Sequence, residues 1–109
     1  MAQVTQLLKG ILQGCILSIL SGGEMYGYKI VEDLKSYGFD DIHEATVYPI
    51  LTRLNKQGIL AFDKRPSELG PPRKYYRLTQ EGKKELEIFS STWNNISKIV
   101  DTMLKENSL

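Results

Sequence analysis

Residues 43–54 read HEATVYPILTRL, and the fold prediction starts from this stretch. Leu51 and Leu54, with the good helix formers around them, predict a helix over about residues 43–57. Pro49 lies inside this helix, where a proline removes one backbone hydrogen bond and crowds the preceding turn, at a cost of about 3 kcal/mol. Either the helix begins late, or the sequence accepts a bend.

Two starting points for this helix remain open from the sequence. If the helix begins at Glu44, Pro49 is its sixth residue and the carbonyl of Ala45 loses its partner within the helix. If Thr46 is the N-cap, Pro49 falls in the first turn, where its amide would be unpaired in any case. In both cases the irregular end of the helix is the end that carries Thr46 and Tyr48.

Two further helices precede this stretch. Apolar residues from Leu7 to Leu20 recur in an i, i+1, i+4, i+5 pattern that is typical of a core helix, and Ser-Gly-Gly at 21–23 ends it. A second helix is predicted from about residue 26 to residue 37, with Gly38 after it. Its inward-facing side chains are expected to be Ile30, Val31, Leu34 and Tyr37, with Tyr26 and Tyr28 as core and cap residues.

The chain changes from helical to extended patterns after residue 58. Residues 59–65 and 73–78 are rich in β-branched, aromatic and alternating side chains, and the segment PSELGPP at 66–72 consists of turn-forming residues. These patterns predict a β-hairpin with a mobile tip. A last helix is then expected to begin after Thr79, its predicted N-cap.

The last helix carries an apolar seam with spacings of three and four residues, which are the a and d positions of a heptad repeat. The residues of the seam are Leu86, Phe89, Trp93, Ile96, Val100 and Met103. The seam either packs against the same domain or is buried against a second copy of the chain. We favour a homodimer, because one small domain has little core left for so wide a stripe and twofold dimers are the commonest oligomers.

Three helices followed by a hairpin give the element order of a winged helix-turn-helix. The fold class is therefore predicted as mainly α with a small β-hairpin (α+β). We expect a winged helix-turn-helix DNA-binding domain over residues 1–78 and a C-terminal amphipathic dimerisation helix over residues 79–109. In helix-turn-helix proteins the second helix of the motif enters the major groove by its N-terminal end. Here that helix is the one that contains Pro49.

The composition excludes several classes of protein. With 41% hydrophobic and 25% charged residues, the chain of 109 residues is expected to form one folded domain. No apolar run is long enough to span a bilayer and no leader pattern is present, so we expect a cytoplasmic protein without a membrane partner. The single cysteine, Cys15, and the single histidine, His43, allow neither an internal disulfide nor a His/Cys metal cluster. We expect no enzyme, no cofactor and no metal, since no set of catalytic groups converges.

The net charge of +1 conceals a concentration of positive charge. Residues 53–84 contain nine basic residues and three acidic ones, so the rest of the chain is negative. A run of charge is usually only a solvated face. Here it coincides with one structural unit, the predicted hairpin and the ends of its neighbouring helices. The basic window therefore indicates a polyanionic partner.

With these residues in view, the chain resembles the PadR family of bacterial winged-helix transcriptional regulators, in the short form with a single C-terminal helix. The resemblance rests on YGYKI at 26–30, EATVYPILTRLNKQGIL at 44–60, GPPRKYYRLTQEG at 70–82, and the tryptophan-centred helix that follows. It implies a homodimer that binds a double-stranded DNA operator of roughly palindromic sequence, usually as a repressor. It also favours a third helix that starts at Glu44, although His43 stands where the family usually has a serine or asparagine cap.

The resemblance further implies which residues contact DNA. The matching residues at the start of the third helix are Glu44, Ala45, Thr46 and Tyr48. Those of the wing are Arg73 and Lys74, with Lys64 and Arg65 on the preceding strand. Arg53, further along the helix, is expected to meet phosphate or solvent. Two points stay open: Tyr48 is equally consistent with packing against the second helix, and Arg73 and Lys74, as neighbours on a strand, must point to opposite faces.

Trp93, at the centre of the seam, has two possible roles. As a large aromatic residue it could anchor the dimer interface. Alternatively, two copies of Trp93 could flank a cavity in which a small planar aromatic effector stacks, as some short PadR-like regulators do with planar compounds. The first role predicts a plain repressor and the second predicts a ligand-responsive one.

One other function competes with transcription regulation by DNA binding. Winged helices also serve as protein-interaction modules without specific DNA binding, in which the third helix packs on another protein. The basic window and the polar outward side of the third helix argue against this alternative. We therefore expect a sequence-specific DNA-binding regulator.

Overall fold

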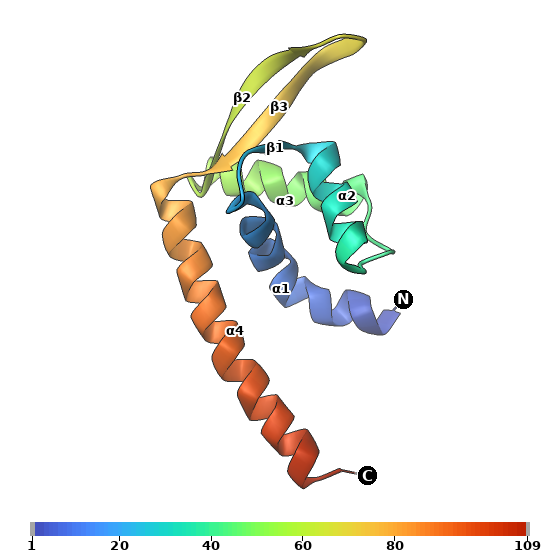
Figure 1. Ribbon diagram of the computed structural model, residues 1–109, viewed down its shortest axis with the longest axis vertical. Coiled ribbons are helices and arrows are strands. Elements are labelled where there is room, and N and C mark those ends of the chain that lie inside the picture. The colour runs from blue at the N-terminus through green and yellow to red at the C-terminus, as the bar shows by residue number, and fades with distance from the viewer. Residues whose placement is uncertain (1, 109) are drawn as a thin grey trace.

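The computed structural model describes the backbone of residues 2–108 and the side chains of residues 7, 8 and 10–108. Its elements are α1 (Ala2–Leu20), β1 (Met25–Tyr26), α2 (Gly27–Tyr37), α3 (Glu44–Lys56), β2 (Leu60–Ser67), β3 (Gly70–Leu78) and α4 (Gln80–Glu106). The strands form one antiparallel sheet in the order β1-β3-β2. The predicted α+β arrangement is confirmed (Figure 1). Among the described residues, no helix combines the length and hydrophobicity needed to cross a bilayer.

The hydrophobic core lies where α1, α2 and α3 meet, and the sheet closes one side of it. Its most deeply buried side chains are Ile16, Leu17, Ile30, Val31, Leu34, Val47, Leu51, Leu54 and Leu60. From β3, Tyr76 covers this core and is only 7% exposed. The prediction that Leu7 and Tyr37 belong to the core is wrong, because their side chains are 75% and 80% exposed. Leu7 lies near the beginning of α1 and Tyr37 is the last residue of α2, where the neighbouring elements do not reach.

The first of the two starting points predicted for α3 is correct. The helix begins at Glu44, and Pro49 lies inside it. His43 occupies the N-cap position, but its side chain makes no cap hydrogen bond. Its carbonyl instead accepts the amides of Thr46 and Val47 at 3.0 and 3.1 Å. The helix is therefore held at its start by backbone hydrogen bonds alone.

The hairpin is longer than the sequence predicts. The segment at 66–72 is not turn throughout, because β2 runs to Ser67 and β3 begins at Gly70. Its three prolines therefore lie in strands. They are tolerated because β2 is an edge strand, β1 pairs with only two residues of β3, and the register is irregular between Arg65 and Ser67. The two-residue strand β1 is too short to leave a periodic signal in the sequence.

The start of α4 is fixed to the junction between α3 and β2. Thr79 is the N-cap, as predicted, and its hydroxyl accepts the amide of Gly82 at 3.0 Å. The same hydroxyl lies within donating distance of the carbonyls of Gly58 at 2.6 Å and Ile59 at 3.0 Å. The amide of Thr79 also donates to Ile59, at 3.2 Å. The direction of α4 is thus set at the point where α3 ends.

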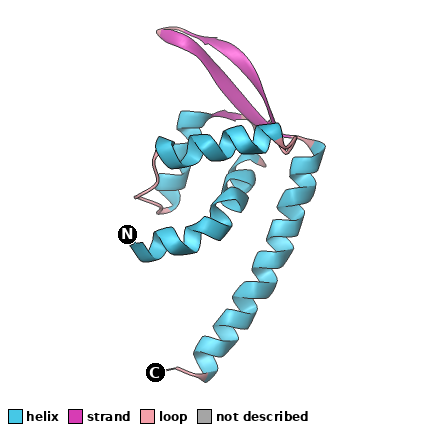
Figure 2. Cartoon of the chain, turned by 180° about the vertical axis from the view of Figure 1, so that it is seen from behind, coloured by secondary structure: helices cyan, strands magenta, loops and turns pink. Residues whose placement is uncertain are grey.

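Only the first part of α4 packs on the rest of the protein. Leu86 is half-buried against the core, and the ring of Phe89 fills the space that a side chain at Gly14 of α1 would need. Beyond these residues α4 extends past the other helices, as both views show (Figures 1 and 2). The predicted seam therefore divides into a part that contacts α1 and a part that the protomer leaves uncovered.

Candidate nucleic-acid interface

One side of α3 is exposed along its length. The buried residues of the helix are Val47, Leu51 and Leu54. Because successive helix residues are about 100° apart around the axis, the opposite side carries Ala45, Pro49 and Thr52, which are all exposed. Pro49 has no amide hydrogen, so the carbonyl of Ala45 on this side lacks its usual partner. The irregular turn of the helix therefore lies at the N-terminal end of its solvent face.

Tyr48 lies on the flank of α3 that faces the hairpin. A Cβ atom on Gly27 would lie 2.8 Å from Cε1 of Tyr48, so the tyrosine ring packs directly on the first residue of α2. The side chain nevertheless stays 43% exposed. Packing against α2 and access to a ligand therefore coexist at this residue. Burial, and after it the nearby charge of Glu44, raises the pKa of the Tyr48 phenol, which keeps it protonated and able to donate a hydrogen bond.

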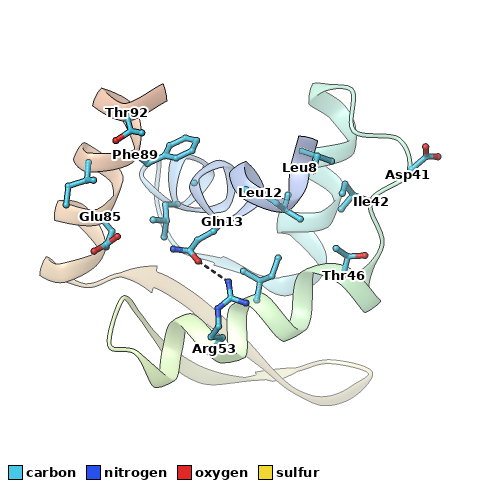
Figure 3. Close-up of a pocket in the computed structure, with 15 residues that line it drawn as sticks. Leu8, Leu12, Gln13, Asp41, Ile42, Thr46, Arg53, Glu85, Phe89 and Thr92 are labelled. Atoms are coloured by element: carbon cyan, nitrogen blue, oxygen red, sulfur yellow. Dashed lines mark hydrogen bonds between the residues drawn. The ribbon is translucent and has the colours of Figure 1, made fainter. Parts of the chain in front are cut away.

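Arg53 is not on the same flank as Tyr48. The two residues are about 140° apart around the axis of α3, and the guanidinium of Arg53 donates to Oε1 of Gln13 in α1 at 2.9 Å (Figure 3). Together with Thr46, Arg53 lines a hollow between α1, α3 and α4. This link engages Arg53 within the protomer, and its expected contact with phosphate or solvent stays a prediction.

The hairpin brings like charges directly opposite one another. Lys64 pairs with Lys74 and Arg65 pairs with Arg73 across β2 and β3. Like charges in opposite positions destabilise a sheet, so their clustering is unfavourable for the isolated protein. Side chains alternate between the two faces of a strand. The two lysines therefore lie on the core-side face that also carries Tyr76, and the two arginines lie on the outer face.

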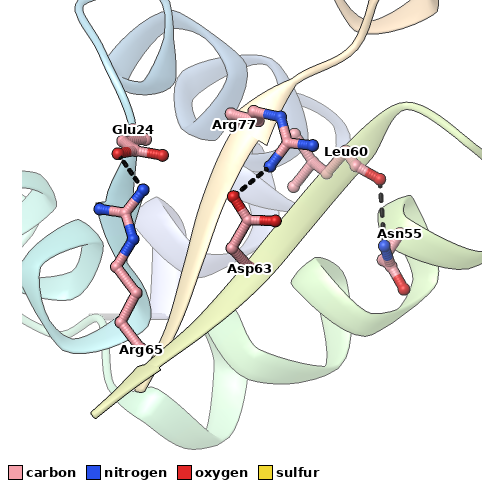
Figure 4. Close-up of polar contacts among 6 residues, drawn as sticks. All are labelled: Glu24, Asn55, Leu60, Asp63, Arg65 and Arg77. Atoms are coloured by element: carbon pink, nitrogen blue, oxygen red, sulfur yellow. Dashed lines mark hydrogen bonds and ion pairs between the residues drawn. The ribbon is translucent and has the colours of Figure 1, made fainter. Parts of the chain in front are cut away.

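The two arginines of the hairpin contact aromatic rings on the outer face. The guanidinium of Arg65 lies 4.6 Å from the ring centre of Tyr75, and that of Arg73 lies 4.4 Å from the ring centre of Tyr26. The two tyrosine rings meet edge to face at 5.5 Å. Arg65 also forms an ion pair with Glu24 (Figure 4). These contacts tie the hairpin to the strand and turn that precede α2.

The lysines of the hairpin have no comparable acidic partners. Among the described residues, neither Lys64 nor Lys74 has a carboxylate within 4.0 Å, whereas Arg77 is paired with Asp63 at 3.0 Å (Figure 4). The ammonium of Lys74 lies 4.8 Å from the ring centre of Phe62, where the ring face holds the cation without neutralising it. The unbalanced positive charge of the hairpin therefore lies on its two lysines and on Arg73, which has an aromatic contact but no carboxylate of the described residues within 4.0 Å either.

A hollow of about 440 Å³, here called the wing hollow, lies between the start of α2, α3 and β3. Its lining residues are Tyr26, Gly27, Tyr28, Tyr48, Thr52, Pro72, Arg73, Lys74 and Tyr76. Sequence reasoning missed Tyr28, which was expected in a core or cap role but is 51% exposed. The helical spacing could have shown that Tyr28 is exposed, because this residue lies about 200° around the helix axis from the buried Ile30.

The uncovered part of α4 is apolar. Its exposed apolar side chains are Ile88, Trp93, Ile96, Ile99, Val100, Met103 and Leu104, each between 44% and 66% exposed. Trp93 and Phe89 also form one wall of a groove of about 670 Å³, whose other wall comes from α1 and α2. An exposed apolar stripe of this length is unusual on a monomeric protein and marks an interaction surface.

Two further ion pairs lie on the surface of the described part of the chain, Lys29 with Asp33 at 3.1 Å and Lys84 with Glu81 at 3.6 Å. Exposed pairs of this kind contribute little to stability. Across the part of the chain that is described, no three histidine, cysteine or acidic side chains are placed to hold a metal ion. Apart from the carboxylates of Glu44, Asp63 and Glu68, the chemistry available around α3 and the hairpin consists mainly of hydrogen-bond donors and positive charge.

Comparison with known proteins agrees with this geometry. The family model described as "Transcriptional regulator PadR-like family" matches residues 16–88. A PadR-like regulator from Bacillus cereus is 41% identical over 91% of this chain and 96% of its own, with a TM-score of 0.82. A PadR family regulator from Eggerthella lenta is 35% identical over 97% and 92%, with a TM-score of 0.86. Bacillus subtilis PadR in complex with operator DNA is 31% identical over 72% of this chain and 45% of its own, with a TM-score of 0.67.

Proposed function

The chain belongs to the PadR-like family of DNA-binding transcriptional regulators, and from this premise we propose that it is a homodimeric repressor of an inverted-repeat operator. The family consists of regulators and not of enzymes, so the unmatched positive charge of the hairpin has a polyanion as its natural partner. The observation that carries the proposal is the opposed pair Lys64 and Lys74 beside the exposed side of α3. The repulsion between the two lysines destabilises the free hairpin, and phosphate groups of DNA would relieve it.

The proposed contacts divide between α3 and the hairpin. At the major groove we place the N-terminal part of α3, with Glu44, Ala45 and Thr46, and with Tyr48 at the edge of the groove beside the hairpin. Along the phosphate backbone we place Lys64 and Lys74, with Arg65 and Arg73 holding the hairpin in position through their aromatic contacts. Phosphate contacts set the position on DNA, and contacts to base edges read its sequence.

Dimerisation is proposed through the uncovered stripe of α4. The residues proposed to form the interface are Trp93, Ile96, Val100 and Met103. Leu86 and Phe89 already pack within the protomer. A twofold axis along α4 would bury the same stripe on both copies. Because Thr79 fixes the start of α4 to the end of α3, such a dimer would also fix the distance between its two α3 helices.

Neutralising the two lysines separates this proposal from a protein-interaction module. In Lys64→Ala with Lys74→Ala, DNA affinity should fall and the slope of log affinity against log salt should decrease by up to about 3.6 per dimer, at ~0.9 per phosphate contact. The hairpin should be no less stable, since the substitution removes a like-charge pair. Salt titrations of DNA binding by fluorescence anisotropy measure both quantities. An unchanged slope would favour the interaction module.

We further propose that a planar aromatic effector binds beside Trp93 and releases the repressor. The groove of about 670 Å³ along Trp93 and Phe89 has the size and apolar lining that such a compound needs. Trp93→Ala should abolish binding of a planar cationic dye, as followed by the dye's own fluorescence, while Tyr37→Ala at the edge of the groove should have a smaller effect. Equal affinity of wild type and Trp93→Ala would leave Trp93 as an interface anchor only.

A further inference from the structure

The wing hollow has four tyrosines around it, from four different elements. Tyr26 comes from β1, Tyr28 from the first turn of α2, Tyr48 from α3 and Tyr76 from β3. Tyr76 is almost wholly buried, yet the described residues contain no buried side-chain oxygen or nitrogen without a hydrogen-bond partner. Since no described residue bonds its hydroxyl, this group reaches solvent through the hollow that the residue lines.

Tyr28, Tyr48 and Tyr76 line the same hollow. Burial, followed by the charges of Glu44 and Tyr28, raises the pKa of Tyr48. Burial, followed by the charge of Tyr48, likewise raises the pKa of Tyr76. The phenols of Tyr48 and Tyr76 therefore stay protonated at neutral pH and can donate hydrogen bonds.

The other polar groups of the hollow are cations or are already engaged. Lys74 supplies an ammonium, which can only donate, and Arg73 closes the outer rim with a guanidinium. The hydroxyl of Thr52 already donates to the carbonyl of Tyr48 at 3.1 Å. No carboxylate lines the hollow. A set of donors with excess positive charge suits an anion, whereas the edge of a base presents acceptors and donors together.

We propose that the wing hollow binds one backbone phosphodiester of the operator in each half-site, held by the hydroxyls of Tyr28 and Tyr48 and the ammonium of Lys74. This inference rests on the proposed function, because the hollow opens between α3 and the hairpin, the two elements that flank a DNA strand in that proposal. The phosphate contact positions α3 in the groove and carries no sequence information of its own.

Gly27 gives the site its rigidity. Because Gly27 has no Cβ, the ring of Tyr48 rests on the backbone at the start of α2, one residue before Tyr28. The two hydroxyl donors are thereby held by the same turn of chain before DNA arrives. A preorganised pair of donors loses less conformational freedom on binding than two free side chains.

Neutral phosphate analogues test the site directly. The probe is a duplex that the wild-type protein selects from a random pool, with a single uncharged methylphosphonate placed in turn at each backbone position. One position per half-site should weaken wild-type binding about tenfold or more. Tyr28→Phe and Tyr48→Phe should each weaken binding to the unmodified duplex by about ten- to a hundredfold, as expected for a hydrogen bond to a charged group. The salt slope should not change, since no charge is removed.

The decisive comparison is whether the loss of affinity from the tyrosine substitutions and the loss from the methylphosphonate are independent of each other. At the sensitive position, the losses from the double Phe variant and from the methylphosphonate should be far less than multiplicative, because both remove the same contact. Tyr37→Phe, at the exposed end of α2, is the matched control and should bind as wild type does. Equal thermal midpoints for all the variants establish that they fold alike.

Two results overturn the inference, and they differ from failure of the proposed function. If Tyr28→Phe and Tyr48→Phe bind as wild type does, the hollow holds no phosphate. If they weaken binding but the loss multiplies with every methylphosphonate position, the tyrosines act elsewhere. In both cases the wild-type protein still selects an operator. A wild-type protein that enriches no sequence from the pool contradicts the proposed function itself, and this inference with it.

Discussion

Replacing Ile96 and Val100 together by aspartate should give a monomer that no longer binds the operator tightly. Both side chains are nearly half exposed in the protomer, at 47% and 44%, and lie on the uncovered stripe of α4. A twofold interface would contain each substitution twice, and each buried, unpaired carboxylate costs several kcal/mol. Sedimentation equilibrium should show the change from dimer to monomer. Operator affinity should fall about a thousandfold or more, because a monomer engages only one half-site.

The matched control adds the same charge to the other side of the same helix. Ser91 and Asn94 are exposed and lie roughly opposite the stripe, so Ser91→Asp with Asn94→Asp should remain dimeric and bind the operator normally. If the Ile96 and Val100 variant also sediments as a dimer, the stripe of α4 is not the interface. In that case the proposed spacing of the two α3 helices would have to be set by another surface.

Gly82→Ala should lower the free energy of unfolding by about 3 kcal/mol. Gly82 is the buried residue of α4, and a Cβ atom there would overlap the carbonyl oxygen of Ile59. This obstacle is backbone, which cannot rotate away as a side chain can, so the start of α4 must move and strain the hydrogen bonds of Thr79. Overpacking of this kind costs typically about 1–3 kcal/mol. Urea denaturation at equal protomer concentration measures the loss.

A glycine with free space provides the contrast. Gly10 lies within α1 with nothing near its missing Cβ, so Gly10→Ala should leave the protein as stable or raise its stability by up to about 1 kcal/mol. Both substitutions are the same chemical change in a helix. If Gly82→Ala were as stable as Gly10→Ala, the junction between α3 and α4 would be looser than the structure indicates.

The elements whose signals are local could be predicted from the sequence. The end of α3 near Gly58 and the Thr79 cap follow from helix ends and hydroxyl chemistry within a few residues, whereas the start of α3 at Glu44 was favoured only by the family resemblance. The seam of α4 is likewise visible as a spacing along one helix. The sequence left open which half of that seam the protomer covers, because that depends on how far α1 extends along α4.

Features that depend on contacts between elements were predicted poorly. The hydrogen bond of Arg53 with Gln13, forty residues earlier in the chain, was not predicted. Tyr28 was expected in a core or cap role and lines the wing hollow instead. The prolines of the hairpin suggested a long turn, and only the pairing of β2 with β3 shows that they lie in strands. In each case the deciding neighbour is distant in sequence.

The most direct test of the account compares the dimer's affinity for DNA from its own upstream region with that for random duplex. At near-physiological salt, a sequence-specific regulator binds its operator at least about a thousandfold more tightly than random DNA. We predict a preference of that size for wild-type protein in competition binding, with two half-sites protected about 34 Å apart. Equal affinity for the upstream region and random duplex would contradict the central claim that this protein reads a specific operator.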